Sequence, residues 1–505
     1  MTCVFIISFS VRMINFRQSV YFGYDEARDA YDSINIYTKG DLKISGPPAS
    51  AFKGINHGPI YLYFIGPLFL LGRGDPYFVS IIFRLINSLG VLLVFAVGTT
   101  YFGKIAGIFA SLLFAFSYEQ YIYGIFTGNP ALSNIFWPVL FIGAGLISSF
   151  SKKVKPGLFL MIVSTSFIAQ FDLILSYSFL VVGVLLILLR DKVRKLKFGD
   201  WFKILTLGFL PVVSYPLAEL KNKFLGVKTF LSIINSNFST LPDGQTRWSL
   251  FINNFVGLFK DNILDFGFNR NVIIFLFLVL IVFLFWKTRK VKQSKYILLW
   301  IFSMSALLLT NGFMPFYSYA GVGIGVILGF SFLLSELFRR NKIIALTILS
   351  LCVVSNVQKI IPQSKDSLIM EIKAQPGMNL DDEINLINKT YEVSSGKMFT
   401  IRTTTMPYKV QTTWSYLFDQ YGVKKYGYKP FLEGGNTFGY LGKFPAPSEG
   451  TTCNRFLIRE PVRGIPQVLV SNDVNEENNF SEIVKEENFG DFVLQIRAAK
   501  AKDCK

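Results

Sequence analysis

Long uncharged apolar runs alternate with short polar connections along the first 358 residues of the chain. A membrane core about 30 Å thick is crossed by a helix of roughly 20 apolar residues, so each run is a candidate span. The pattern therefore predicts an all-α polytopic membrane domain over residues 1–358. Its eleven candidate spans are residues 1–16, 78–101, 104–122, 130–150, 156–170, 173–190, 201–220, 271–286, 295–311, 315–338 and 342–358.

A different pattern follows Gln358. The stretch NLDDEINLINKTY, residues 379–391, has helical periodicity with acidic residues at its start. Three short runs, KMFTIRTTT (397–405), QVLVS (467–471) and FVLQIRA (492–498), are typical of strands because they are rich in β-branched and apolar residues. We therefore expect residues 359–505 to form a separate mixed α/β domain.

Composition agrees with this division. Of the 505 residues 51% are hydrophobic and 52 are Phe, which is more apolar than an ordinary soluble domain. The formal net charge is +18, but the residues after 358 hold 19 basic and 18 acidic side chains, a balance of +1, so +17 belongs to the membrane part. This basicity follows membrane topology and gives no reason to expect nucleic-acid binding.

The basic residues also predict an orientation in the cell membrane. They gather in the connections after every second span, as in Arg190–Lys197, whereas the intervening connections at 119–129 and 311–317 hold none. The positive-inside rule then places the N-terminus in the cytoplasm. We expect the first outer loop (17–77), a second outer loop (221–270) and the tail to be extracytoplasmic, and any catalysis to occur on that side.

The four cysteines divide between the two regions. Cys3 and Cys352 fall in expected spans, and Cys453 and Cys504 lie in the tail. A disulfide can persist outside the cell, so a bridge between Cys453 and Cys504 is one alternative. Two cysteines alone establish no pairing.

Acidic residues are concentrated directly after the first apolar segment, in YFGYDEARDAYDSINIY, residues 21–37. The pairs Asp25 with Asp29 and Arg28 with Asp32 have i,i+4 spacing, which favours an interfacial helix with carboxylates at its amino end. A structural interpretation is that Asp25 caps this helix and Glu26 suits its dipole. A functional role is the alternative.

The first loop continues with NHGPIYLYFIGPLFLLG, residues 56–72, which contains the only histidine, His57. A lone histidine is more often a hydrogen-bonded structural residue than a catalyst. The segment Pro59–Leu71 is too short to span the membrane, so we expect a re-entrant or interfacial helix.

Three stretches resemble one known family. They are GYDEARDAYDSINIYTKGDLKISGPPASAFKGINHGPIYLYF (23–64), FRLINSLGVLLVFAVG (83–98) and TGNPALSNIFWPVLF (127–141). This sequence is similar to membrane glycosyltransferases with the GT-C fold, of the protein O-mannosyltransferase and aminoarabinose transferase type, and above all to a prokaryotic subgroup with DEARD followed by HGPxYY. The Asp-Glu pair after the first helix is the family's hallmark.

The resemblance implies an inverting sugar transferase. Its donor would be a polyprenyl-phosphate-linked sugar, and its acceptor a hydroxyl of a protein, glycolipid or surface polymer at the outer face. The resemblance makes Asp25 the general base, with Glu26 beside it, because a carboxylate opposite the leaving group takes the hydroxyl proton and stabilises positive charge. The candidates for the donor phosphate are Arg28, His57, Arg84 and Lys53. Arg28 and Arg84 are preferred for their bidentate geometry, although Arg84 could equally be a structural arginine.

Departures from the family pattern limit what carries over. Asn56-His57-Gly58-Pro59 stands where aminoarabinose-type enzymes show EKP, so an acidic metal ligand is missing. We therefore expect no tightly bound metal, which leaves room for a divalent cation held by Asp25 and Glu26 with the phosphate.

The family's QxH is here Gln170-Phe171-Asp172. Asp172 could supply a second carboxylate or cap a helix. Tyr61, Tyr123, Asn129 and Gln170 are further candidates for the substrate pocket, although Asn129 with Pro130 could simply begin a helix.

Other readings remain open. The stretch RWSLFINNFVGLFKDNIL, residues 247–264, is amphipathic enough for a lid over the cavity or for a surface-bound linker helix. A lipid-linked sugar flippase or transporter would also be polytopic, but it should concentrate ionisable groups near mid-membrane and show interrupted helices. An inactive receptor-like relative is a third reading. The acid in an outer loop favours the enzyme.

Overall fold

A computed structural model of the chain describes residues 1–49, 54–235, 246–309, 315–365, 375–434, 441–445, 452–461 and 465–500. Its contacts divide the chain into two compact units, which are described here one at a time. The helical unit comprises Met1–Ile14, Leu42–Tyr63 and Ile81–Pro362. The mixed unit comprises Asn15–Asp41, Phe64–Ser80 and Gln363–Lys505, so pieces of the first loop belong with the tail.

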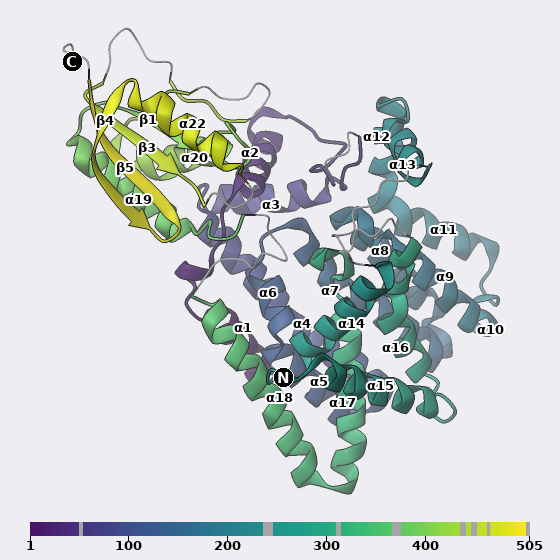
Figure 1. The fold of residues 1–505 in the computed structure, drawn as a ribbon. Coiled ribbons are helices and arrows are strands. Elements are labelled where there is room, and N and C mark those ends of the chain that lie inside the picture. Colours follow the sequence, from purple (N-terminus) through teal and green to yellow (C-terminus); the bar gives the residue numbers. More distant parts are fainter. Residues whose placement is uncertain are drawn as a thin grey trace. The chain divides into compact units, whose positions relative to one another are not determined.

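The helical unit is built from helices throughout its described residues (Figure 1). The division between the units runs through α3 and α4. The helices are α1 (Thr2–Arg12), α3 (Ile60–Leu71), α4 (Pro76–Phe102), α5 (Lys104–Phe116), α6 (Tyr118–Ile125), α7 (Asn129–Ser149), α8 (Val154–Phe171), α9 (Ser178–Leu188), α10 (Arg190–Val193), α11 (Phe198–Phe209), α12 (Ser214–Lys221), α13 (Leu225–Asn235), α14 (Arg247–Asn262), α15 (Arg270–Lys287), α16 (Ser294–Ile301), α17 (Val322–Arg340) and α18 (Lys342–Gln363), with 3-10 turns at η2 (Ser151–Lys153), η3 (Leu173–Tyr177), η4 (Leu210–Val213), η5 (Phe302–Leu309) and η6 (Phe316–Tyr319).

Among the described residues, seven helices are long and apolar enough to cross a membrane, or eight if α5 and α6, bent by 57° at their junction, make one span. Three more of the predicted spans coincide with shorter apolar helices, Thr2–Arg12, Leu173–Leu188 and Ser294–Leu308. Each of the eleven predicted spans therefore coincides with an apolar helix, while a count of eleven crossings stays a prediction.

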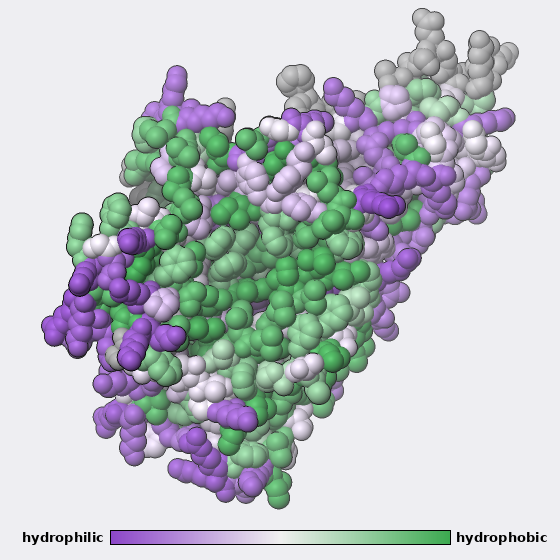
Figure 2. All heavy atoms as spheres, turned by 180° about the vertical axis from the view of Figure 1, so that it is seen from behind, coloured by the Kyte–Doolittle hydropathy of each residue, from purple (hydrophilic) through white to green (hydrophobic). Residues whose placement is uncertain are grey.

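The helices of this unit expose many apolar side chains, as helices that face lipid do. Figure 2 shows a broad area of apolar side chains with hydrophilic side chains at its edges. Ile187 of α9, Phe202 of α11 and Phe285 of α15 are all exposed. A continuous exposed apolar surface of this kind is typical of a protein embedded in a membrane.

In the interior of the helical unit, glycines allow helices to approach closely and aromatic rings stack on one another. A Cβ on Gly143 of α7 would lie 2.5 Å from the Gly157 carbonyl of α8, so only glycine permits this close approach. The Phe141 and Trp300 rings stack at 4.2 Å, and the indole N–H of Trp300 donates to the Gly321 carbonyl at 3.0 Å. Gly321 has φ of +85° and lies against Trp137, which again excludes a side chain.

The mixed unit contains a five-stranded sheet in the order β2-β1-β3-β5-β4. Strand β1 is parallel to β2 and β3, whereas β5 is antiparallel to β3 and β4. Helix α22 packs on β1 and β4, and α19 packs on β4 and β5 (Figure 1). The elements are η1 (Arg17–Ser19), α2 (Tyr24–Lys39), α19 (Leu380–Ser394), β1 (Phe399–Thr404), α20 (Thr412–Leu417), the π-helix η7 (Phe418–Val423), α21 (Lys424–Tyr426), β2 (Phe431–Leu432), β3 (Asn454–Arg459), α22 (Gln467–Asn478), β4 (Ser481–Phe489) and β5 (Phe492–Ala499).

The predicted mixed α/β tail is present, with one correction. The predicted helix at 379–391 and the predicted strands at 397–405 and 492–498 correspond to α19, β1 and β5. The predicted strand QVLVS was wrong, because Gln467–Asn478 is the helix α22. Its short apolar run fits either element. Val470 is buried while Val468 is 62% exposed. The run is therefore the first part of a helix with one buried side, and the helix continues into the polar residues that follow.

Candidate active site

The Asp-Glu pair lies in the first turn of α2, within the mixed unit. Gly23 occupies the N-cap position, and its backbone N–H donates to Glu26 Oε2 at 3.1 Å. Glu26 is buried and secures the start of its own helix. The expectation that Asp25 is the cap was therefore wrong, because the chain turns into the helix two residues earlier, where a glycine accepts the extended cap geometry.

Asp25 is the more open member of the pair, with its side chain 53% exposed. The Arg28 guanidinium donates to Asp25 Oδ1 and to Asp29 Oδ1, each at 2.8 Å. Asp29 is buried, and this burial raises its pKa to about 7 in spite of the opposing effect of Arg28. One guanidinium thus contacts two carboxylates of α2, one three residues before it and one adjacent to it, rather than Asp32 at the predicted i,i+4 spacing.

A second polar cluster lies in the helical unit, where the His57 turn meets the end of α8. The Gly58 N–H donates to the Gln170 carbonyl at 2.9 Å, and a Cβ on Gly58 would lie 1.9 Å from Gln170 Oε1. The Leu173 N–H donates to His57 Nδ1 at 3.2 Å. Asp172 Oδ1 lies 3.5 Å from the same nitrogen. The loop is therefore fixed to the C-terminal end of α8 by backbone hydrogen bonds and by the histidine itself.

Asp172 and Gln170 present buried acceptors in this cluster. Asp172 Oδ1 accepts the Ile174 N–H at 3.2 Å, which confirms the predicted capping role at η3. Gln170 Nε2 donates to Ser214 Oγ at 2.9 Å. Among the described residues, Asp172 Oδ2 and Gln170 Oε1 are buried and lack a hydrogen-bond partner. Burial raises the pKa of Asp172 to about 8. Two such acceptors are suited to a ligand that brings O–H or N–H donors.

The remaining pocket candidates divide between this cluster and the interior. Tyr61 donates to the Thr127 carbonyl at 2.7 Å, and Asn129 donates to the Phe171 carbonyl. Both side chains therefore tie the α6–α7 connection to the cluster, and Asn129 begins α7 as the helix-start interpretation predicted. Tyr123 lies apart from them, buried, with its hydroxyl on the Phe316 carbonyl at 3.1 Å.

Of the other candidates for the donor phosphate, Arg84 is fully buried inside the helical unit and donates to the Arg12 carbonyl. This placement fits the structural alternative that the sequence left open. Lys53 lies outside the described residues. Cys504 does too, so the Cys453–Cys504 bridge stays a prediction.

Sequence reasoning missed a polar cluster at the bend between α5 and α6. Asn262 of α14 donates to Glu119, and Ser117 Oγ donates to Asn262 Oδ1 at 2.7 Å. The Tyr118 N–H donates to Asn356 Oδ1 at 2.9 Å. Ser117, the N-cap of α6, accepts the Gln120 N–H at 3.1 Å. Glu119 is buried. It is the only acidic residue in the predicted span 104–122, and that isolation could have marked it.

The predicted lid sequence forms α14, which is packed rather than surface-bound. Phe251, Phe255 and Phe259 are buried on one side of this helix, and it contacts α15 and α17. A pocket of about 450 Å³ lies elsewhere, in the mixed unit, and none of the predicted site residues lines it. Its lining residues are Ile384, Asn388, Gln420, Tyr421, Lys424 and Lys425.

The Asp25–Glu26 pair does not fit a metal site. One Asp25 oxygen is occupied by the Arg28 cation, and one Glu26 oxygen accepts the Gly23 N–H. Within the described ranges no group of three or more His, Cys, Asp or Glu side chains is arranged to hold a metal ion. A hard divalent cation takes about six or more oxygen ligands, and this pair with its Arg28 cation does not supply such a set, so we derive no step through one.

These features belong to a multi-pass membrane protein with an appended α/β unit, and the whole chain follows a known architecture. It is similar to ArnT from Cupriavidus metallidurans bound to undecaprenyl phosphate, with a TM-score of 0.61 at 10% sequence identity over 98% of this chain and 97% of that chain. The apo state of the same protein matches with a TM-score of 0.58 at 10% identity over the same shares.

An oligosaccharyltransferase from Archaeoglobus fulgidus matches with a TM-score of 0.48 at 11% identity, over 87% of this chain and 65% of that chain. No family model matches the sequence, and no curated protein is similar to it. The match to ArnT confirms the predicted GT-C fold. At 10% identity it establishes the fold alone.

Proposed function

We propose that this protein is an inverting glycosyltransferase. It moves a sugar from a polyprenyl-phosphate-linked donor to a hydroxyl acceptor, which is a protein, glycolipid or surface polymer, at the outer face of the cell membrane. The observation that carries the proposal is the fold, which matches a protein bound to undecaprenyl phosphate over nearly the full length of both chains. The Asp-Glu pair that follows the first apolar helix adds to it.

Asp25 is the residue that we assign to the chemistry. Its carboxylate is the exposed one of the pair, so an acceptor hydroxyl can approach it and transfer its proton as the anomeric carbon is attacked. Arg28 has two roles in this proposal. It orients Asp25 in the resting protein, and it can turn toward a phosphate, for which its planar donors are suited. Glu26 positions the helix start through Gly23.

The His57 cluster is the proposed binding site for sugar hydroxyls. Asp172 Oδ2 and Gln170 Oε1 are buried acceptors without partners in the described structure. Sugar hydroxyls would satisfy them, and a site whose buried acceptors need donors discriminates strongly against analogues that lack those donors. His57, with Nδ1 accepting from Leu173, carries its remaining proton on Nε2 and can donate to a phosphate or sugar oxygen.

The test is sugar transfer by the purified full chain from a polyprenyl-phosphate sugar to extracted surface glycans. The Asp25→Asn variant should lose about 100-fold or more of the transfer rate, the usual size of a general-base contribution. Asp41→Asn, which removes an exposed carboxylate from the same loop, is the matched control and should transfer at the parental rate. Parental transfer by Asp25→Asn would remove the general-base assignment.

One observation favours a second candidate, a lipid-linked sugar flippase. The bend of 57° between α5 and α6 and the buried Glu119 form an interrupted helix with an ionisable group, as transporters use. The two functions separate in proteoliposomes that contain a lipid-linked sugar and no acceptor. Translocation that Glu119→Gln abolishes and Asp25→Asn leaves intact would support the flippase, and transfer without translocation would support the enzyme.

A further inference from the structure

Helices α2 and α19 of the mixed unit start from one shared piece of backbone. Tyr21 and Asn379 form an antiparallel bridge, and the Leu380 N–H donates to the Val20 carbonyl at 3.0 Å. Helix α2 begins three residues after this bridge, and α19 begins directly after it. The first turns of both helices are therefore fixed to each other, so we expect a displacement of the first turn of one helix to displace that of the other.

Glu383, in the first turn of α19, has an unusual environment. It is fully buried, and neither of its carboxyl oxygens has a hydrogen-bond partner among the described residues. By contrast Asp381, two residues earlier, is partly exposed and lies 3.6 Å from Arg17. A negatively charged carboxylate in the first turn stabilises a helix through the helix dipole. This effect accounts for the partly exposed Asp381 better than for the buried Glu383. Leaving a buried carboxyl group unbonded is costly and calls for another explanation.

The ionisable groups that act most strongly on Glu383 are three acids from different parts of the mixed unit. Glu26 comes from α2, Glu460 follows β3, and Asp382 precedes it on α19. Together with burial, these carboxyl groups raise the pKa of Glu383 well above its usual value. The pKa of the Tyr21 phenol is raised as well, by burial and then by Glu26, which shows that the same acids surround the bridge.

We propose that Glu383 keeps its proton in the working protein and acts as a neutral positioning residue beneath the amino end of α2. Glu26 can then hold the Gly23 N–H without a second negative charge beside it, and the adjacent Asp25 is presented in a fixed place. Loss of the Glu383 proton at alkaline pH sets like charges against each other and loosens the start of α2. The positioning role rests on the proposed function of Asp25, whereas the protonation of Glu383 does not.

The protonation is tested directly by infrared difference spectroscopy of the full chain at neutral pH. Wild type minus Glu383→Gln should show the C=O stretch of a protonated carboxyl group. Asp381→Asn, the same chemical change at an exposed position of the same turn, is the matched control and should show no such band. If Glu383→Gln does not fold, Glu383→Met, of similar length and apolar, replaces it. Absence of the band from this difference spectrum overturns the proposal.

The positioning role is tested by the pH profile of transfer. Wild type should lose about tenfold in rate for each pH unit above the ionisation of Glu383, with faster amide hydrogen exchange at the start of α2. Glu383→Gln should change less than about twofold over the same range. An unchanged alkaline loss in this variant overturns the positioning role. A wild type that shows the infrared band but transfers no sugar would remove the proposed function and leave the protonation standing.

Discussion

Each unit of the molecule buries arginine, but the two units satisfy it with different partners. In the helical unit, Arg12 donates to neutral acceptors, which are Asn87 Oδ1 at 2.5 Å, Ser8 Oγ at 2.8 Å and the Ala115 carbonyl at 3.1 Å. In the mixed unit, Arg455 donates to two carboxylates, Glu477 at 2.7 and 3.0 Å and Glu433. Both arginines are essentially inaccessible to solvent.

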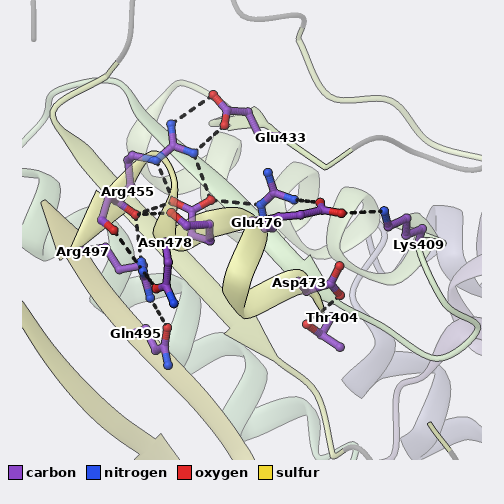
Figure 3. A network of polar contacts seen from close by, with 12 residues as sticks. Thr404, Lys409, Glu433, Arg455, Asp473, Glu476, Asn478, Gln495 and Arg497 are labelled. Carbon is purple, nitrogen blue, oxygen red and sulfur yellow. Dashed lines mark hydrogen bonds and ion pairs between the residues drawn. The ribbon is translucent and has the colours of Figure 1, made fainter. Parts of the chain in front are cut away.

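The source of the acceptors explains the difference. The carbonyls of Phe114 and Ala115 lie at the end of α5, where the bend into α6 leaves them without helical partners, so the broken helix itself supplies negative partial charge to Arg12. The mixed unit instead gathers charged side chains from separate elements. Figure 3 shows Arg455 facing Glu433, while Arg497 of β5 lies beside Gln495 of the same strand and Asn478 at the end of α22. Arg12 is thus surrounded by neutral side-chain and backbone acceptors, whereas Arg455 is paired with carboxylates.

The largest effect is expected from Arg455→Met. Removing Arg455 takes the guanidinium away from Glu433 and leaves the buried Glu477 with Arg402 as its remaining ion-pair partner among the described residues. The free energy of unfolding of the mixed unit should therefore fall by about 3–5 kcal/mol. Hydrogen exchange of β3 and β5 in the full chain measures the loss. Arg459→Met, on the same strand but in a partly exposed pair with Glu486 at 3.2 Å, is the control and should cost about 1 kcal/mol or less. Equal losses would mean that burial does not govern these pairs.

A pH dependence of intermediate size is expected from Glu460. Its pKa is raised from 4.5 to about 7, mainly by burial. The folded state therefore keeps a proton that the unfolded state releases above pH 4.5, so stability is greatest at low pH and falls as pH rises through 7. The expected fall is about 3 kcal/mol over this window.

Trp414 reports on this titration, because its indole N–H donates to Glu460 Oε1 at 2.9 Å. Tryptophan fluorescence of the full chain, recorded against pH with and without denaturant, gives the slope. Glu460→Gln should make the slope of stability against pH less steep. Trp414→Phe should remove the Trp414 fluorescence and, because the hydrogen bond to Glu460 is lost with it, raise the pKa of Glu460 further. A variant Glu460→Gln with the parental slope would assign the dependence to other acids of the mixed unit.

Local patterns predicted much of the fold, and long-range partners limited the prediction of the site. The apolar runs correctly predicted helices, and the acidic start of α19 was readable because dipole and periodicity act within a few residues. QVLVS was wrong because a five-residue run does not distinguish strand from helix. The pairing of Arg12 with Asn87 joins residues 75 positions apart, and nothing local marks it.

The candidate site shows the same limit. The concentration of acidic residues at the start of α2 followed from the sequence alone, but the pairing of Arg28 with both Asp25 and Asp29 did not. The contact of His57 with Asp172, more than a hundred residues away, did not follow from it either. Neither residue carries a local signal for the other: His57 was singled out as the only histidine of the chain, and Asp172 only through the family resemblance. The burial of Glu383 depends on the packing of the whole mixed unit.

The smallest effect is expected from Arg12→Met. This variant tests directly whether Arg12, unlike Arg455, has only neutral partners. Methionine fills similar space and removes the charge, so the variant leaves only neutral groups unpaired. The free energy of unfolding in detergent should therefore fall by about 1–2 kcal/mol, clearly less than for Arg455→Met. Arg17→Met, at a 73% exposed side chain, should change it by no more than about 0.5 kcal/mol. A loss as large as that of Arg455→Met would show that a full negative charge balances Arg12, and the backbone carbonyls of the broken helix would not then be its main partners.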